Sequence, residues 1–176
     1  MSTRLTILGL LRQRNLHGYE IKQVIEEHMG DWTSIAFGSI YFALAKLAKE
    51  GLVRKVSVGK SGNRPSRTVY GITACGRVQF RRLLESLWRS PERQFFAFDL
   101  ALFFRSELPP QKIRRYLEQR IAHAQQALQH LRRHKTEGMA DPQIPRIARA
   151  IFDHTLAHLE AEMRWLETIK EEGHDP

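Results

Sequence analysis

The chain has 176 residues, of which 42% are hydrophobic, and this excludes a disordered protein and allows one large domain or two small ones. Residues 1–90 hold 15 basic and 6 acidic side chains, a net charge of 15 − 6 = +9, whereas residues 91–176 hold 13 of each. The first half is therefore expected to bind a polyanion, either nucleic acid or a membrane surface. The sequence shows no signal peptide and no run of the roughly 20 apolar residues that a membrane span needs, and its single cysteine, Cys75, excludes an internal disulfide and agrees with a reducing cytoplasm.

Three short helices are expected in the first third of the chain. An apolar run at residues 5–11 predicts a buried helix, and residues 15–18 predict a turn. A second helix is expected over residues 19–29 and a third over residues 38–51, with Gly51 as its C-cap glycine. The last two helices follow each other across a turn and a brief linker, which is typical of a helix-turn-helix.

The third of these helices has two faces of different chemistry. Ile40, Leu44 and Leu47 recur at i, i+4 and i+7 and form an apolar face. The opposite face is small, polar and basic, and it carries Ser39, Phe42, Ala45, Lys46 and Lys49. Such a helix suits the major groove of DNA, and the alternative is an ordinary surface helix with solvated lysines.

A β-hairpin is expected next. Residues 52–58 and 67–72 are rich in β-branched side chains, and the loop between them is dense in turn formers. No acidic residue lies between Glu50 and Glu85. The loop and its shoulders carry Arg54, Lys55, Lys60, Arg64 and Arg67. A cationic hairpin beside a helix-turn-helix is typical of a wing that contacts phosphates or the minor groove, whereas alone it could equally be a solvated loop.

The hairpin is followed by another expected helix, which Thr73 caps and which runs to Trp88. Cys75 falls just inside its N-terminus, where a thiolate is stabilised. A redox sensor is therefore one hypothesis for Cys75, and a small packed residue is the favoured alternative.

These residues together resemble the PadR family of winged-helix transcriptional regulators. The resembling motifs, in order, are HGYE at 17–20, GSIYFAL at 38–44, KEGLV at 49–53, NRPSRTVY at 63–70 and ITACG at 72–76. The resemblance implies a mainly α fold, with an N-terminal winged helix-turn-helix and two-stranded β-wing over residues 1–90 and a C-terminal helical dimerisation domain over residues 91–176. It places Ser39 and Tyr41 in the leading turn of the recognition helix and Arg64 and Arg67 in the wing. The residues expected to contact DNA are Ser39, Tyr41, Phe42, Lys46, Lys60, Arg64 and Arg67.

The second half predicts helices packed through heptad-like stripes. An aromatic stretch at residues 93–104 predicts a buried helix, and a further helix is expected to start at Pro109–Pro110. Two apolar stripes step by 4, 3, 4 and 3 residues, namely Leu117, Ile121, Ala124, Leu128, Leu131 and Phe152, Leu156, Leu159, Met163, Leu166. They favour coiled-coil-type packing within or between chains. The resemblance implies homodimerisation, and a C2 dimer would read an inverted repeat with half-sites about 34–36 Å apart.

Other side chains offer further chemistry. His130 with His134, and His154 with His158, lie at i, i+4 and are possible metal half-sites, but a solvated helix face is the favoured interpretation, so no metal is expected. Trp88, Phe95 and Phe96 are candidates for a pocket that holds a small hydrophobic effector, with plain core packing as the alternative.

No phosphate-binding loop, nucleophile–base pair or metalloprotease motif occurs, so neither an enzyme nor a cofactor is expected. The sequence therefore predicts a cytoplasmic, homodimeric regulator that binds an inverted-repeat operator in double-stranded DNA, acting as a repressor that responds to an unidentified signal. The alternatives are a protein-interaction adaptor that keeps a winged helix without binding DNA, and a metal-dependent or small-molecule-binding enzyme.

Overall fold

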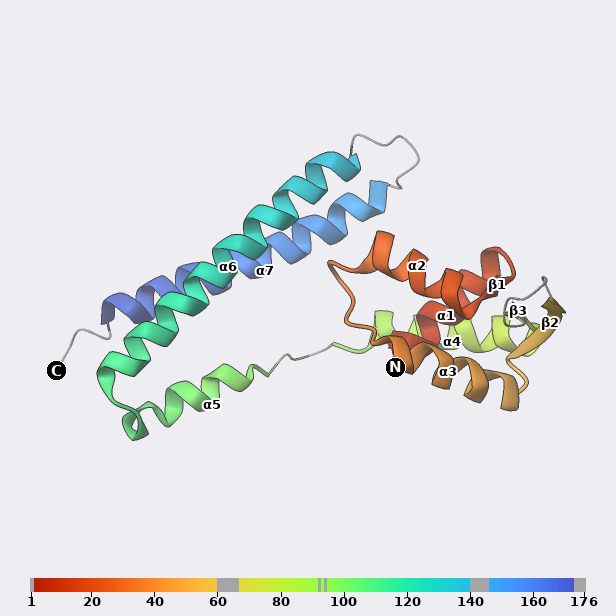
Figure 1. The fold of residues 1–176 in the computed structure, drawn as a ribbon, viewed down its shortest axis with the longest axis horizontal. Helices are drawn as coiled ribbons and strands as arrows, with labels where there is room; N and C mark the ends of the chain where they lie inside the picture. Colours follow the sequence, from red (N-terminus) through yellow and green to blue (C-terminus); the bar gives the residue numbers. More distant parts are fainter. Residues whose placement is uncertain (1, 60–66, 92, 94, 140–145, 173–176) are drawn as a thin grey trace. The chain divides into compact units, whose positions relative to one another are not determined.

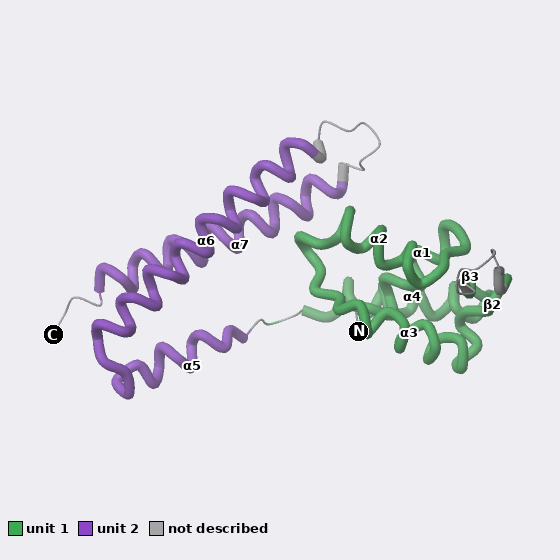
Figure 2. Tube along the Cα trace, viewed as in Figure 1, with its two compact units in different colours: residues 1–93 green, residues 94–176 purple. Residues whose placement is uncertain are grey.

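A computed structural model describes residues 2–59, 67–91, 93, 95–139 and 146–172 of the chain. They belong to two compact units, Met1–Arg93 and Gln94–Pro176, which Figure 2 shows in green and purple. The boundary expected between residues 90 and 91 lies near this division. The roles assigned to the two halves stay predictions.

The N-terminal unit combines helices with a small antiparallel sheet (Figure 1). Its elements are α1 (Ser2–Gln13), β1 (Leu16–His17), α2 (Gly18–Met29), α3 (Phe37–Lys49), β2 (Val53–Gly59), β3 (Arg67–Ile72) and α4 (Ala74–Arg89). The predicted helix-turn-helix is α2 and α3, and the predicted wing strands are β2 and β3. The order in the sheet is β1-β3-β2.

The turn expected at residues 15–18 is wrong. Leu16 pairs with Tyr70 and His17 pairs with Val69, so these two residues form a third strand on the open side of β3. Leu16 is also buried in the core. A strand of two residues has no period that a pattern could reveal, which is why β1 was not predicted.

The wing strands are joined in an irregular register. Lys55 faces Tyr70 and Ser57 faces Val69, so Val56 has no residue opposite it and forms a β-bulge. One extra residue shifts every later side chain of a strand to the other face of the sheet, so the side chains of β2 do not alternate regularly along the whole strand.

The core of the N-terminal unit fixes α3. Ile40, Leu44 and Leu47 are fully buried, as their spacing predicted, and they pack in one cluster with apolar side chains of α1 and α2. Burying each of them stabilises the fold by about 1.5–3 kcal/mol. Gly51 follows the helix with a positive φ of 70°, a conformation that favours glycine and ends α3 as expected.

Thr73 ties the end of the wing to the next helix. Its hydroxyl accepts a hydrogen bond from the Gly76 N–H at 3.0 Å, which confirms it as the N-cap of α4. The same hydroxyl lies 2.8 Å from the Gly51 carbonyl oxygen, to which it donates. One side chain therefore links the C-terminal end of α3 to the start of α4.

The C-terminal unit contains α5 (Ala97–Phe103), a 3-10 turn (Arg105–Glu107), α6 (Pro110–Met139) and α7 (Arg146–Glu172). Helices α6 and α7 run antiparallel and lie side by side (Figure 1). Both predicted stripes face inward within the chain, and Leu117, Leu128, Leu131, Phe152 and Leu166 are buried. Arg132 pairs with Glu160 at 2.8 Å and Arg120 with Glu162 at 3.1 Å across the helix pair.

The aromatic stretch that was expected to be buried is mostly exposed. Only Phe98 and Leu102 of α5 pack against α6 and α7, with Phe98 in a T-shaped contact with Trp165. The opposite side of this short helix forms an apolar ridge that we call the α5 ridge, consisting of Phe96, Leu100, Phe103 and Phe104. The prediction of a buried helix is wrong because an apolar side chain needs cover that this one chain does not supply.

Among the described residues, no helix is long and apolar enough to cross a membrane.

Thr73→Ala should lower the free energy of unfolding by about 1 kcal/mol, because it removes an N-cap. Urea denaturation followed by circular dichroism measures this loss. The matched control is Thr168→Ala, an exposed threonine whose hydroxyl donates to the Arg164 carbonyl within α7. Its effect should stay within about 0.5 kcal/mol. Equal losses in the two variants would contradict the capping role.

Candidate nucleic-acid interface

The outward face of α3 presents aromatic and basic side chains. Tyr41 is 55% exposed and Phe42 is 72% exposed, and Lys46 also lies on the surface. Ser39 differs from the expectation because it is half-buried, and its hydroxyl donates to the Ala36 carbonyl oxygen at 2.5 Å. Its oxygen can still accept a hydrogen bond, so Ser39 presents an acceptor rather than a donor at this surface.

The ring of Tyr41 lies against Gly18, where the lack of a side chain leaves room for it. A Cβ atom at position 18 would lie only 2.6 Å from Cε1 of the Tyr41 ring, which is closer than atoms can approach. Gly18 is the first residue of α2, so the phenol ring of α3 lies directly on the start of the neighbouring helix. The glycine therefore leaves the space that the Tyr41 ring occupies.

The start of α2 is held by a reciprocal cap. Nδ1 of His17 accepts from the Glu20 N–H at 3.1 Å, and the Glu20 carboxylate accepts from the His17 N–H at 2.8 Å. This capping box fixes the backbone on which Tyr41 rests. Histidine is not among the usual N-cap residues, so the sequence did not predict this cap.

Three further residues of the helix-turn-helix were not predicted from the sequence. The ammonium of Lys22 lies 3.9 Å from the centre of the Phe37 ring and 5.9 Å from that of Tyr19. These contacts hold a cation between α2 and the first turn of α3. Tyr19 and Lys22 are three residues apart on one helix, which was the available signal, whereas Phe37 reaches them only through the fold.

The far end of α3 is fastened to α1. Arg4 donates two hydrogen bonds to the Glu50 carboxylate, at 2.8 and 2.5 Å. This fork-like pair gives α3 a second anchor beside its apolar face. The hydrogen bonds from Arg4 lower the pKa of Glu50 from its ordinary value.

The N-terminal unit also carries exposed cations on the wing and on α4. Arg54 and Lys55 of β2 are exposed, and so are the arginines Arg77, Arg81 and Arg82 of α4. Of the predicted wing contacts, Lys60 and Arg64 lie outside the described residues. Arg67 begins β3, and its backbone pairs with Gly59, but its side chain is not among the described parts of the structure.

The predicted effector residues are strongly exposed. Trp88 is 85% exposed, Phe95 is 81% exposed and Phe96 is 52% exposed. Core packing, the alternative that the sequence favoured for them, is therefore wrong within the single chain.

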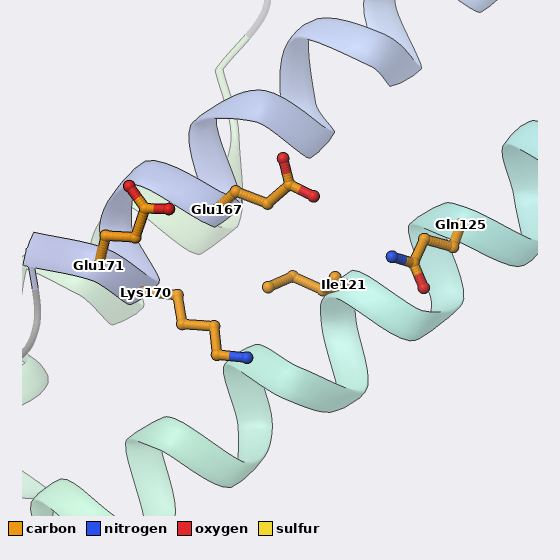
Figure 3. A pocket seen from close by; sticks show the side chains of 5 residues that line it. All are labelled: Ile121, Gln125, Glu167, Lys170 and Glu171. Carbon is orange, nitrogen blue, oxygen red and sulfur yellow. The ribbon is translucent and has the colours of Figure 1, made fainter.

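A separate groove of about 380 Å³ lies between α6 and α7 (Figure 3). Its lining consists of Ile121, Gln125, Glu167, Lys170 and Glu171. Lys170 reaches across from α7 toward α6, where it lies 3.7 Å from Glu118. The mixed charges and open shape of this groove differ from the flat aromatic pocket expected for a hydrophobic effector.

Cys75 lies in the first turn of α4, as predicted, but it is exposed. The interpretation of Cys75 as a packed residue is therefore wrong. Exposure leaves its thiol accessible to solvent and metal ions.

Comparison with known proteins supports this geometry. Residues 7–82 match the Transcriptional regulator PadR-like family, and residues 98–172 match Virulence activator alpha C-term. The Negative transcriptional regulator PadR of Bacillus subtilis (strain 168) is 28% identical over 170 residues, covering 93% of this chain and 92% of the relative.

Two solved structures of that relative share the fold. The crystal structure of Bacillus subtilis PadR in complex with operator DNA has a TM-score of 0.79 at 24% identity, covering 98% of this chain and 99% of the other. The structure with p-coumaric acid has a TM-score of 0.79 at 24% identity, covering 99% and 100%. These likenesses confirm the predicted winged-helix fold.

Glu50→Gln should destabilise the protein at neutral pH and lose this effect in acid. Because the folded pKa of Glu50 is lowered, its stabilisation is fully present above the unfolded pKa of about 4.3 and disappears as the pH falls through the folded pKa. Thermal unfolding of both proteins at a series of pH values checks this. The control is Glu171→Gln, which removes an exposed carboxylate of the other compact unit, and an equal loss of stability in the two variants at neutral pH would contradict the role of the Arg4–Glu50 pair.

Proposed function

Because the chain belongs to the PadR-like family of transcriptional regulators, we propose that it is a repressor that binds operator DNA as a homodimer. The protein is a regulator rather than an enzyme, because its family and the relative described above are transcriptional regulators. The observation that carries the DNA-binding role is the outward face of α3, where Tyr41, Phe42 and Lys46 are exposed while the opposite face is locked in the core.

In this proposal α3 enters the major groove. Its Tyr41 and Phe42 side chains meet base edges and thymine methyl groups, and Lys46 meets a phosphate. Ala36 supplies no side-chain cap to α3, so the first backbone N–H groups of the helix suit a second phosphate. The cations of β2, together with Lys60, Arg64 and Arg67 of the wing, bind the neighbouring backbone.

The α5 ridge is the proposed contact with a second copy. Phe103 is 80% exposed, and the other members of the ridge are more than half exposed as well. A contiguous aromatic surface of this kind is typical of an obligate interface, and a C2 pair buries the same ridge twice. One winged helix reads few base pairs, so a dimer also supplies the second half-site that a specific operator requires.

In this proposal the dimer acts in the cytoplasm, where the DNA lies, and represses transcription by occupying a promoter. The relative that matches nearly the whole chain is named a negative regulator, and one of its structures holds p-coumaric acid. By analogy the signal is a small aromatic molecule, for whose ring the exposed side chains of Trp88, Phe95 and Phe96 offer stacking surfaces. It must bind one spacing of the two recognition helices better than another, since otherwise it shifts no equilibrium.

The DNA-binding role is tested with two variants that act as controls for each other. Tyr41→Ala should weaken binding to the operator by about tenfold or more, with little effect on random DNA, because it removes a base contact. Lys46→Gln should weaken both and lower the slope of log affinity against log salt by about one per protomer. Fluorescence anisotropy over a salt series, on an operator found by footprinting DNA that flanks the gene, gives both quantities. A wild-type chain without salt-dependent DNA binding would instead support the adaptor function.

The dimer interface is tested by placing charges on the α5 ridge. The double substitution Phe103→Glu and Phe104→Glu should convert the dimer to a monomer at micromolar concentration, because it buries like charges across the two-fold axis. Light scattering measures the mass, and circular dichroism shows whether the helices persist. Phe42→Glu, at an equally exposed aromatic of α3, should leave a dimer. A folded double variant that stays dimeric would place the interface elsewhere.

A further inference from the structure

Helix α7 carries two histidines whose rings converge. Nε2 of His154 lies 3.1 Å from Nε2 of His158, and the ring centres are 4.5 Å apart. Both side chains are exposed on the same side of the helix, one turn apart. In such a contact one nitrogen donates its hydrogen and the other contributes a lone pair, so a single proton occupies the space between the rings.

This separation fits a metal ion in place of that proton. Zinc binds imidazole nitrogen at about 2.0–2.1 Å, and two nitrogens 3.1 Å apart at that distance subtend an angle of roughly 98°. That angle is close to those of tetrahedral and square-planar coordination. Imidazole suits zinc, copper and nickel ions, whereas it is a poor ligand for calcium and magnesium.

The neighbouring acids are engaged elsewhere. Asp153 pairs with Lys135, Glu160 pairs with Arg132 and Glu162 pairs with Arg120, all across to α6. These ion pairs draw the three carboxylates nearest to the histidine pair toward α6, so the two imidazoles are the proposed donors. The remaining coordination positions would then be filled by water.

We propose that His154 and His158 form a surface chelate for a borderline divalent cation such as Zn²⁺ or Cu²⁺. The ion links two successive turns of α7 and thereby stabilises the α6–α7 hairpin, because metal that binds only the folded helix raises its stability. The inference does not depend on DNA binding, since every residue that carries it lies on the C-terminal unit.

The other histidine pair of the chain provides an internal comparison. His130 and His134 have the same spacing on α6, but their ring centres are 6.0 Å apart. The ring of His134 packs edge-on against Phe152 at 5.7 Å. Equal spacing in the sequence thus gives ring centres 4.5 Å apart on α7 and 6.0 Å apart on α6, where the ring of His134 also packs against Phe152.

The test is calorimetric titration of ZnCl₂ into the full chain, without a purification tag and after treatment with a chelator. All proteins carry Cys75→Ser, because the exposed thiol is itself a zinc ligand. Binding of one ion that depends on the α7 pair is expected, and His158→Ala should lower the affinity of that ion at least about tenfold. The double control His130→Ala and His134→Ala should leave the affinity within about twofold.

Thermal unfolding provides a second readout. Zinc should raise the melting temperature of the parent chain and not that of His158→Ala, whereas the two proteins should melt together in the presence of chelator because His158 is exposed. Absence of zinc binding to the parent chain, or binding that survives His158→Ala and is lost in the α6 double variant, would overturn the proposal.

Discussion

The burial of one face of α3 is the constraint on which the rest of the structure depends. Ile40, Leu44 and Leu47 are at most 1% exposed, so the helix cannot rotate without bringing apolar surface into water. Its opposite face is thereby fixed in direction. The Arg4–Glu50 pair at one end and the Gly18–Tyr41 contact near the other hold the same helix against α1 and α2. The DNA-binding proposal draws on the direction that these contacts set.

The sequence predicted the features that repeat or that depend on one residue type. Helical spacing predicted which face of α3 is buried, and Thr73 and Gly51 had the residue types that cap a helix. Two features of the candidate site could not be predicted in this way. The contact between the Tyr41 ring and Gly18 joins residues that are 23 positions apart in the sequence. The N-cap of α2 is His17, and histidine seldom caps helices.

The aromatic stretch around α5 shows the limit of hydrophobicity as a predictor. Its composition indicated that these side chains require cover, and Phe98 and Leu102 do receive it from α6 and α7. The other side of α5 stays exposed in one chain. Hydrophobic patterning reports that apolar surface must be removed from water, but it does not say whether the same molecule or another one covers it. The two histidine pairs show a similar limit for polar groups, because the same i, i+4 spacing gives different ring separations on α6 and α7.

The β-bulge at Val56 has a consequence for the behaviour of the protein at high concentration. Strand β2 lies at the edge of the sheet, where unpaired backbone groups could recruit a strand from another molecule and start aggregation. The bulge twists this edge locally, and the adjacent charges of Arg54 and Lys55 repel an identical strand. A feature that interrupts the regular ladder therefore also guards the wing against self-association into extended sheets.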